Sequence, residues 1–139
     1  MDAYILENVE KIVSDEQIEC TLGLIDIDGY PTVSAINVSK NEGIKWFTFC
    51  TFTDGDKVKR IRKCNKASIC FYSVYPHFNI TLVGKIEEVH DQDIKNIMWY
   101  RACKHYWNNT QDPNYTVLKF TTERYKIMYE HEKIEGKIV

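Results

Sequence analysis

The sequence has no pair of cysteines at the short spacing that metal sites and disulfide frameworks use. Its five cysteines are scattered and odd in number, at Cys20, Cys50, Cys64, Cys70 and Cys103. This pattern favours free thiols in a reducing compartment. The four histidines also lack close ligand spacing, so we expect no zinc site and assign no metal.

Long apolar runs and a strong excess of one charge are also missing. The net charge is −2, which does not suggest a partner such as nucleic acid. No stretch approaches the roughly 18 apolar residues that span a bilayer, and the N-terminal MDAYILENVEKIV carries acids where a signal peptide would be basic. Repeats and linkers are absent as well. We therefore expect one soluble, cytoplasmic domain over residues 1–139.

What the sequence does have is a series of short β-type segments joined by turns. Helical spacing predicts helices over 2–14, 54–63 (capped by Thr53 or Asp54) and 91–107. Asp28-Gly29 and Asn41-Glu42-Gly43 are turn signals. The predicted strands are 20–27, 32–39, 44–53, 67–74, 78–89 and 116–129. Together they indicate a mainly β fold, a six-stranded antiparallel barrel or sandwich with peripheral helices.

The predicted helix over 91–107 carries two apolar stripes. One contains Ile94, Ile97, Met98 and Ala102, and the other contains Trp99, Cys103, Tyr106 and Trp107. One stripe can face the barrel, and the other then needs a second subunit or a ligand. The alternative is a helix surrounded by a single core. Aromatic residues make up 13% of the chain, which suits an aromatic-lined pocket or a protein interface.

Four segments in order carry a resemblance to a known family. They are Gly29–Ala35; Trp46–Thr51 followed by Lys57 and Ile61; Asn65–Ile69; and Asn79–Glu87 with a central Gly84. Tyr106-Trp107 and Asp112–Tyr115 extend the likeness. The set resembles the FMN-binding split barrel of the pyridoxamine 5'-phosphate oxidase superfamily, and more closely its general stress protein branch. The resemblance implies a six-stranded split β-barrel, FMN as cofactor, and a homodimer with the flavin at the subunit interface.

The resemblance implies a phosphate site where a threonine-bearing strand meets a helix start. Thr51 and Lys57 match that pattern, and Thr53 offers a second hydroxyl. A helix N-terminus has unpaired N–H groups and a partial positive charge, both of which suit a phosphate. The alternative for Lys57 is a solvated lysine, since Lys59, Arg60, Arg62 and Lys63 follow it closely.

The flavin ring would use a different set of residues. By the resemblance, backbone groups at Ser34, Ala35, Ile36 and Asn37 and at Phe49, Cys50 and Thr51 would meet the polar edge of the ring. Asn79 stands where the oxidases have a glutamine, and Trp107 of a partner subunit would cover the ring. The alternatives are a solvent-facing Asn79 and a Trp107 buried in the core.

The chain departs from the family pattern at the phosphate site. Ser34 stands where the family often has arginine, and Gly55-Asp56-Lys57 stands where full oxidases have Ser-Arg-Lys. Losing cations weakens phosphate binding, so a flavin-free protein is an alternative. Arg60, one turn further on, would offset the loss if it pointed the same way.

Three functional interpretations remain. The first is an FMN-dependent oxidoreductase of an unknown small molecule, with no catalytic residue assigned. The second is a non-catalytic flavin- or heme-binding dimer, with His77 or His105 as heme ligand. The third is a flavin-free, stress-associated dimer. No arginine follows Arg124, whereas oxidases of pyridoxamine phosphate use C-terminal arginines, so we do not expect that activity.

Overall fold

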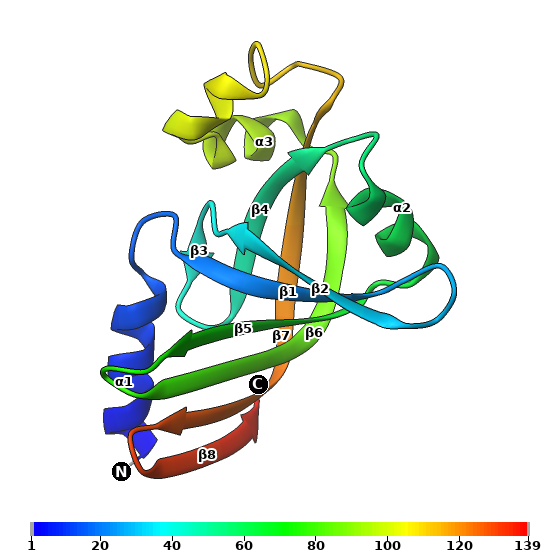
Figure 1. Cartoon of the computed structure of the whole chain (residues 1–139). Coiled ribbons are helices and arrows are strands. Elements are labelled where there is room, and N and C mark those ends of the chain that lie inside the picture. The colour runs from blue at the N-terminus through cyan, green and yellow to red at the C-terminus, as the bar shows by residue number, and fades with distance from the viewer. Residues whose placement is uncertain (1, 139) are drawn as a thin grey trace.

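The computed structural model describes residues 2–138 as an antiparallel sheet with helices around it (Figure 1). The helices are α1 (Asp2–Val13), α2 (Asp56–Lys63), α3 (Gln92–Met98) and the 3-10 helix η1 (Arg101–His105). The strands are β1 (Glu19–Ile25), β2 (Pro31–Asn37), β3 (Asn41–Glu42), β4 (Trp46–Phe52), β5 (Lys66–Ser73), β6 (Phe78–Val89), β7 (Tyr115–Tyr129) and β8 (Glu132–Lys137).

The sheet curls on itself without closing. Its strand order is β2-β1-β5-β6-β7-β4-β3, and β8 pairs with β7. Just after β2 the two ends of the sheet touch, where the Ser39 N–H donates to the Thr48 carbonyl (2.7 Å) and the Thr48 N–H donates to the Lys40 carbonyl (2.8 Å). Among residues 2–138 no ladder joins β2 to β4 beyond this point, so the barrel is split there. The expected split barrel is therefore confirmed.

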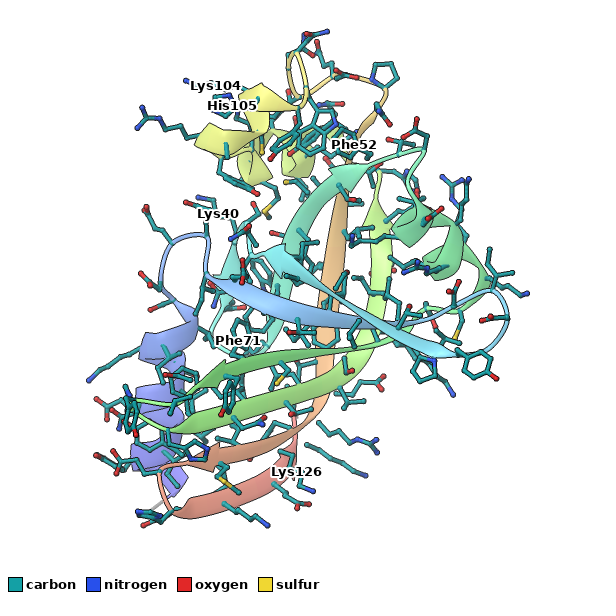
Figure 2. All side chains as sticks on the ribbon, viewed as in Figure 1. Lys40, Phe52, Phe71, Lys104, His105 and Lys126 are labelled. Carbon is teal, nitrogen blue, oxygen red and sulfur yellow. The ribbon has the colours of Figure 1, made fainter. Side chains whose placement is uncertain are left out.

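Alternating side chains fill the barrel. In β6 the residues that point inward, such as Ile80, Leu82 and Ile86, are fully buried, as the period of two requires. They meet a cluster of Phe47, Phe71 and Phe120, of which Phe71 is marked in Figure 2. The amphipathic helix α1 covers this core with Ile5, Val9 and Val13. These contacts confirm the helix predicted over residues 2–14.

All six predicted strands are present, together with two short ones that the sequence did not reveal. β3 forms inside the predicted 41–43 turn and pairs with β4. β8 folds back along β7 through a tight turn at Glu130, whose φ is +55°. That turn has no glycine or asparagine, and Ile134 is the one buried residue of β8. The sequence therefore carries only weak signals for this turn and for strand β8.

The single helix predicted over 91–107 is wrong. α3 ends at Met98, Trp99 and Tyr100 are extended, and η1 follows. The Met98 carbonyl accepts a hydrogen bond from the Ser39 hydroxyl instead of continuing the helix. This break changes the direction of both apolar stripes of the predicted helix. The side chains beyond it join a second core, the cap cluster, made of Met98, Cys103, Trp107, Tyr115 and Val117.

The break leaves part of the first stripe exposed. Ile94 and Ile97 are 39% and 63% exposed, and Ala102 also faces solvent. The second stripe, which the sequence left in need of a partner, instead buries Cys103 and Trp107 within the same chain. Within the described residues, no helix combines the length and the apolar character required to span a bilayer.

The predicted cap of α2 is also wrong. The N-cap is Gly55, and no side chain caps the helix. The Thr53 hydroxyl lies 2.6 Å from the Thr116 hydroxyl and donates to the Pro113 carbonyl at 2.8 Å. Since Thr53 is tied to the loop before β7, its hydroxyl is not available to the start of α2.

Candidate functional site

The split between β2 and β4 exposes two strand edges to each other. Val38 N–H bonds toward the β1 side and Ser39 N–H toward β4. Because these directions alternate along a strand, the backbone groups of Ala35 and Asn37 also point toward β4. By the same alternation, those of Cys50 point toward β2, whereas the Phe52 carbonyl accepts from the Gly55 N–H at 3.0 Å. Backbone N–H and C=O groups thus face the split from both sides, and no β-ladder pairs the two edges there.

One end of the split opens into a depression of about 340 Å³, here called the mouth pocket. β2, the end of β4 and the first turn of α2 form its walls. Its lining residues are Thr32, Val33, Ser34, Thr51, Phe52, Gly55, Asp56, Lys57 and Arg60. Hydroxyls and cations therefore face one space.

Charge in the mouth pocket comes from two basic side chains. Lys57 is half-buried and, among the described residues, forms no ion pair. Arg60 lines the same pocket, with its Nε 3.4 Å from a carboxylate oxygen of Asp26. The uncapped N–H groups at the start of α2 add a partial positive charge, and the exposed Asp56 opposes it. Because Asp26 offsets the charge of Arg60, Lys57 and the N–H groups at the start of α2 are the features of the pocket that favour an anion.

The other basic residues of α2 point elsewhere. Arg62 forms a two-pronged ion pair with Glu88, at 2.7 and 3.0 Å, and the Lys63 ammonium donates to the Ile27 carbonyl at 2.9 Å. The Arg62 guanidinium holds the pKa of Glu88 below its usual range. Lys59 is exposed and lines neither pocket of the split. All of these side chains are basic, and Lys57 and Arg60 differ from the others in that they line the mouth pocket.

A second depression, here called the cap pocket, continues from the first. It has a volume of about 280 Å³ and shares Thr51, Phe52 and Lys57 with the mouth pocket. Its other lining residues are Ala35, Ile36, Asn37, Cys50, Tyr100, Tyr106 and Trp107. The two pockets form one groove along the split.

Aromatic rings make up much of the cap pocket. Phe52, at the tip of β4 just below α3 and η1 in Figure 2, has its ring 5.0 Å from that of Trp107. Tyr106 lies 5.7 Å from Trp107 and is 62% exposed. The Trp107 indole N–H donates to the Asn114 carbonyl at 2.8 Å, which holds the ring in place. A flat aromatic ligand group would find stacking surfaces here.

The groove brings most of the sequence-predicted residues together. Eight of them line it: Ser34, Ala35, Ile36, Asn37, Cys50, Thr51, Lys57 and Trp107. Phe49 has its side chain fully buried in the barrel core. Thr53 binds the loop before β7 instead. The sequence did not identify Tyr100 and Tyr106 as site residues; their positions depend on the break at Met98.

Asn79 lies apart from the groove. It lines a separate pocket of about 370 Å³ on β6 and β7 with His77, Thr81, Lys126, Ile127, Met128 and Lys133. Its side-chain oxygen accepts from the Thr81 hydroxyl at 3.1 Å. His105 lines another pocket, of about 380 Å³, which shares Asn37, Tyr100 and Tyr106 with the cap pocket.

Comparison with protein families and structures gives a consistent result. A family model described as pyridoxamine 5'-phosphate oxidase matches residues 5–129. A solved structure from Clostridium acetobutylicum, of a protein related to general stress protein 26 of B. subtilis (pyridoxinephosphate oxidase family), is 30% identical. It superposes with a TM-score of 0.88, over 99% of this chain and 97% of its own. No curated protein sequence matches the chain.

More distant structures share the fold. An FMN-binding, pyridoxamine 5'-phosphate oxidase-related protein from Nostoc punctiforme is 14% identical, with a TM-score of 0.70 over 99% of this chain and 95% of its own. A heme-binding protein from Mycobacterium smegmatis is also 14% identical, with a TM-score of 0.78 over 95% of this chain and 57% of its own. Structures with this fold thus include proteins described as binding different cofactors.

Proposed function

The chain belongs to the pyridoxamine 5'-phosphate oxidase family, and we propose that it is an FMN-binding flavoprotein that oxidises or reduces a small molecule. The observation that carries this proposal is the continuous groove along the split. It has two cations and an uncapped helix start at one end and aromatic rings at the other. FMN has the same layout, with a phosphate at one end and a flat ring system at the other.

The mouth pocket is the proposed phosphate site. Lys57 and Arg60 would supply charge, Thr51 and Ser34 hydroxyl donors, and the first N–H groups of α2 backbone donors. Asp56 works against an anion, but it is exposed and solvent screens it. Arg60 would replace part of the charge lost at Ser34.

The cap pocket is the proposed site of the flavin ring. Free backbone groups of Ala35, Asn37 and Cys50 can pair with the polar edge of the ring, while the exposed Tyr106 offers a face for stacking. Trp107 is only 6% exposed and packs behind Tyr106, which matches the alternative of a Trp107 buried in the core. These residues would bind and orient the cofactor and exclude water from one side of it. Hydride or electron transfer is the chemistry that FMN supplies when bound.

The proposal includes a homodimer. Asn79 lines a pocket that shares no residue with the groove, so within one protomer it does not line the proposed ring site. A second copy could bring its own Asn79 amide to the ring of the first. The exposed Ile94 and Ile97 offer apolar surface for such contact.

The proposal is tested by titrating the apoprotein with FMN. Quenching of the flavin fluorescence reports how much FMN is bound. Lys57→Ala should weaken FMN binding about ten- to a hundred-fold, the value of one charge-assisted hydrogen bond of roughly 1.5–3 kcal/mol. Riboflavin, which lacks the phosphate, should bind the variant and the parent almost equally. If Lys57→Ala binds FMN as well as the parent does, the phosphate site is wrongly placed.

Lys59→Ala is the matched control. It removes the same charge from the same helix, from a side chain outside the groove. It should leave FMN affinity nearly unchanged at moderate salt, since its field is screened. Equal losses in Lys57→Ala and Lys59→Ala would indicate a general basic field instead of a contact.

Heme is the competing ligand, because His105 lines a pocket that adjoins the cap pocket. The absorption spectrum separates the cases. A flavin spectrum in the purified protein supports our proposal. A heme Soret band that His105→Ala abolishes favours a heme-binding protein. Colourless protein that rejects both added FMN and heme favours a flavin-free, stress-associated role.

A further inference from the structure

The outward face of the β7–β8 hairpin is basic, although the chain as a whole has a net charge of −2. The alternate residues Ile127 and Ile134 are buried in the barrel core, so their neighbours point outward. Three ladder pairs lie side by side on the outward face: Arg124 with Lys137, Lys126 with Glu135, and Met128 with Lys133. Four of these six residues are cations and one is an acid, so positive charge is concentrated here.

A depression of about 370 Å³, here called the sheet pocket, opens on the same face. Its lining residues are His77, Asn79, Thr81, Lys126, Ile127, Met128 and Lys133. Among the residues that the structure describes, no carboxylate lines it. It shares no lining residue with the mouth pocket or the cap pocket, so it is a separate site.

The hydrogen bonds of Asn79 leave donors facing this pocket. Its side-chain oxygen accepts from the Thr81 hydroxyl at 3.1 Å and from the Cys70 thiol at 3.5 Å. The oxygen can accept two hydrogen bonds, and both are made within the chain. Within residues 2–138 the amide N–H groups of Asn79 have no such partner, and they are not buried. They can therefore donate to a ligand.

The charged side chains of the pocket are also free to bind. Lys133 forms no ion pair within the described part of the chain. The Lys126 ammonium, marked in Figure 2, is 4.0 Å from a carboxylate oxygen of Glu135, and both side chains are 69% exposed. Such an exposed pair contributes little, so Lys126 can turn to a ligand at small cost. The His77 ring packs edge-on against Tyr72, with 6.2 Å between ring centres.

We propose that the sheet pocket binds a small polyanion, a molecule that carries phosphate or carboxylate groups. The ammonium groups of Lys126 and Lys133 balance its charge, and the Asn79 amide donates to one of its oxygens. The volume of the pocket suits a ligand of metabolite size. Since the site lies within one protomer and apart from the groove, it needs neither FMN nor a second copy.

The experiment is a titration of isotope-labelled apoprotein with inorganic pyrophosphate and, in a parallel sample, with citrate, followed by NMR. The side-chain amide signals of Asn79 and the backbone amide signals of Lys126 and Lys133 should shift together. Asn79→Ala identifies the side-chain signals by removing them. We expect a dissociation constant near or below about 1 mM for at least one probe. The probe that binds more tightly shows whether the pocket prefers phosphate or carboxylate.

Lys126→Ala and Lys133→Ala should each weaken binding about three- to ten-fold, because each removes one exposed charged contact. Lys137→Ala is the matched control. Lys137 lies on the same outward face of β8 as Lys133 but does not line the pocket. Its removal should change the affinity less than about two-fold at moderate salt, which screens its field. The NMR spectrum of each variant also shows whether it is folded.

Pyrophosphate should enter the mouth pocket as well if that pocket holds the phosphate of FMN. Lys57→Ala should weaken binding there and leave the shifts in the sheet pocket unchanged, so the two sites are tested separately. No shift of the Asn79 and Lys126 signals at about 10 mM of either probe would overturn the proposal. Equal losses in Lys133→Ala and Lys137→Ala, or loss of the sheet-pocket shifts in Lys57→Ala, would also overturn it.

Discussion

Lys57 and Arg60 are the residues on which the anion site depends. They are three positions apart on α2, the spacing that places two side chains on one face of a helix. The same face meets Ser34 of β2 across the split. Sequence placed Lys57 in the site through a family pattern but left the direction of Arg60 open. The structure places Arg60 in the lining of the mouth pocket, where Asp26 of the turn between β1 and β2 forms an ion pair with it.

Ser34→Arg should tighten FMN binding about ten- to a hundred-fold, because it adds one charge-assisted hydrogen bond of roughly 1.5–3 kcal/mol in the mouth pocket. The titration described for Lys57→Ala measures this. Tyr30→Arg, at a position 70% exposed on the same hairpin, adds the same charge outside the pocket and is the control. If Ser34→Arg binds FMN no more tightly than Tyr30→Arg does, β2 does not pass the phosphate.

At the scale of elements, Gly84 shows why β6 and β7 can cross so closely. A Cβ atom at Gly84 would lie 2.0 Å from the Thr121 carbonyl oxygen, far inside van der Waals contact. The register of β6 against β7 also shifts between Val83 and Gly84. Such a bulge bends the strand and increases its twist. This bend is one device by which the sheet curls far enough to bring β2 opposite β4.

Gly84→Ala should lower the free energy of unfolding by about 3 kcal/mol, the upper end of the usual range for overpacking, because backbone must move. Gly29→Ala is the comparison: its φ is +91° and nothing lies within 4 Å of the added Cβ, so it should cost about 1 kcal/mol of backbone strain. Urea unfolding of both variants measures the difference. If both variants lose the same free energy of unfolding, the close approach of β6 and β7 at Gly84 is not rigid.

At the scale of the whole molecule, two cores meet at the groove. The barrel core and the cap cluster lie on opposite faces of β4, with Phe47 and Phe49 in one and Cys50 packed against the other. Figure 1 shows the cap, formed by α3 and η1, above the end of β4. A ligand along the split would touch side chains from both units, so its binding should stabilise both.

The protein should sediment as a homodimer at micromolar concentration. The reasons are the exposed Ile94 and Ile97, and the position of Asn79 in a pocket that shares no lining residue with the groove of the same protomer. Sedimentation velocity measures the state directly. A monomer would remove the shared flavin site while leaving the phosphate site of one protomer intact.

Pyridoxamine phosphate should not be turned over at a useful rate. After Arg124 the chain folds back as β8, which carries Lys133 and Lys137 but no arginine. Arginine binds phosphate through a planar fork that lysine cannot reproduce. Formation of pyridoxal phosphate by the FMN-loaded protein at about 1 per second or faster would contradict this prediction.

The sequence by itself determined the local features of this protein. Runs of β-forming residues between turn signals located six strands, helical spacing located α1 and α2, and Asp28-Gly29 marked the first hairpin. These features could be predicted because β-branched and aromatic residues favour strands, and because burial on one face of a helix leaves a period in the sequence. Family resemblance then pointed to eight residues that do line the groove.

Only the tertiary structure decided which of these elements meet. The capture of the Met98 carbonyl by Ser39, 59 residues earlier in the chain, breaks the predicted long helix and places Tyr100 and Tyr106 in the groove. Register and curvature put Arg60 in the pocket and Asn79 outside it. Such contacts join residues far apart in the chain and depend on how the whole sheet closes, so no local period records them.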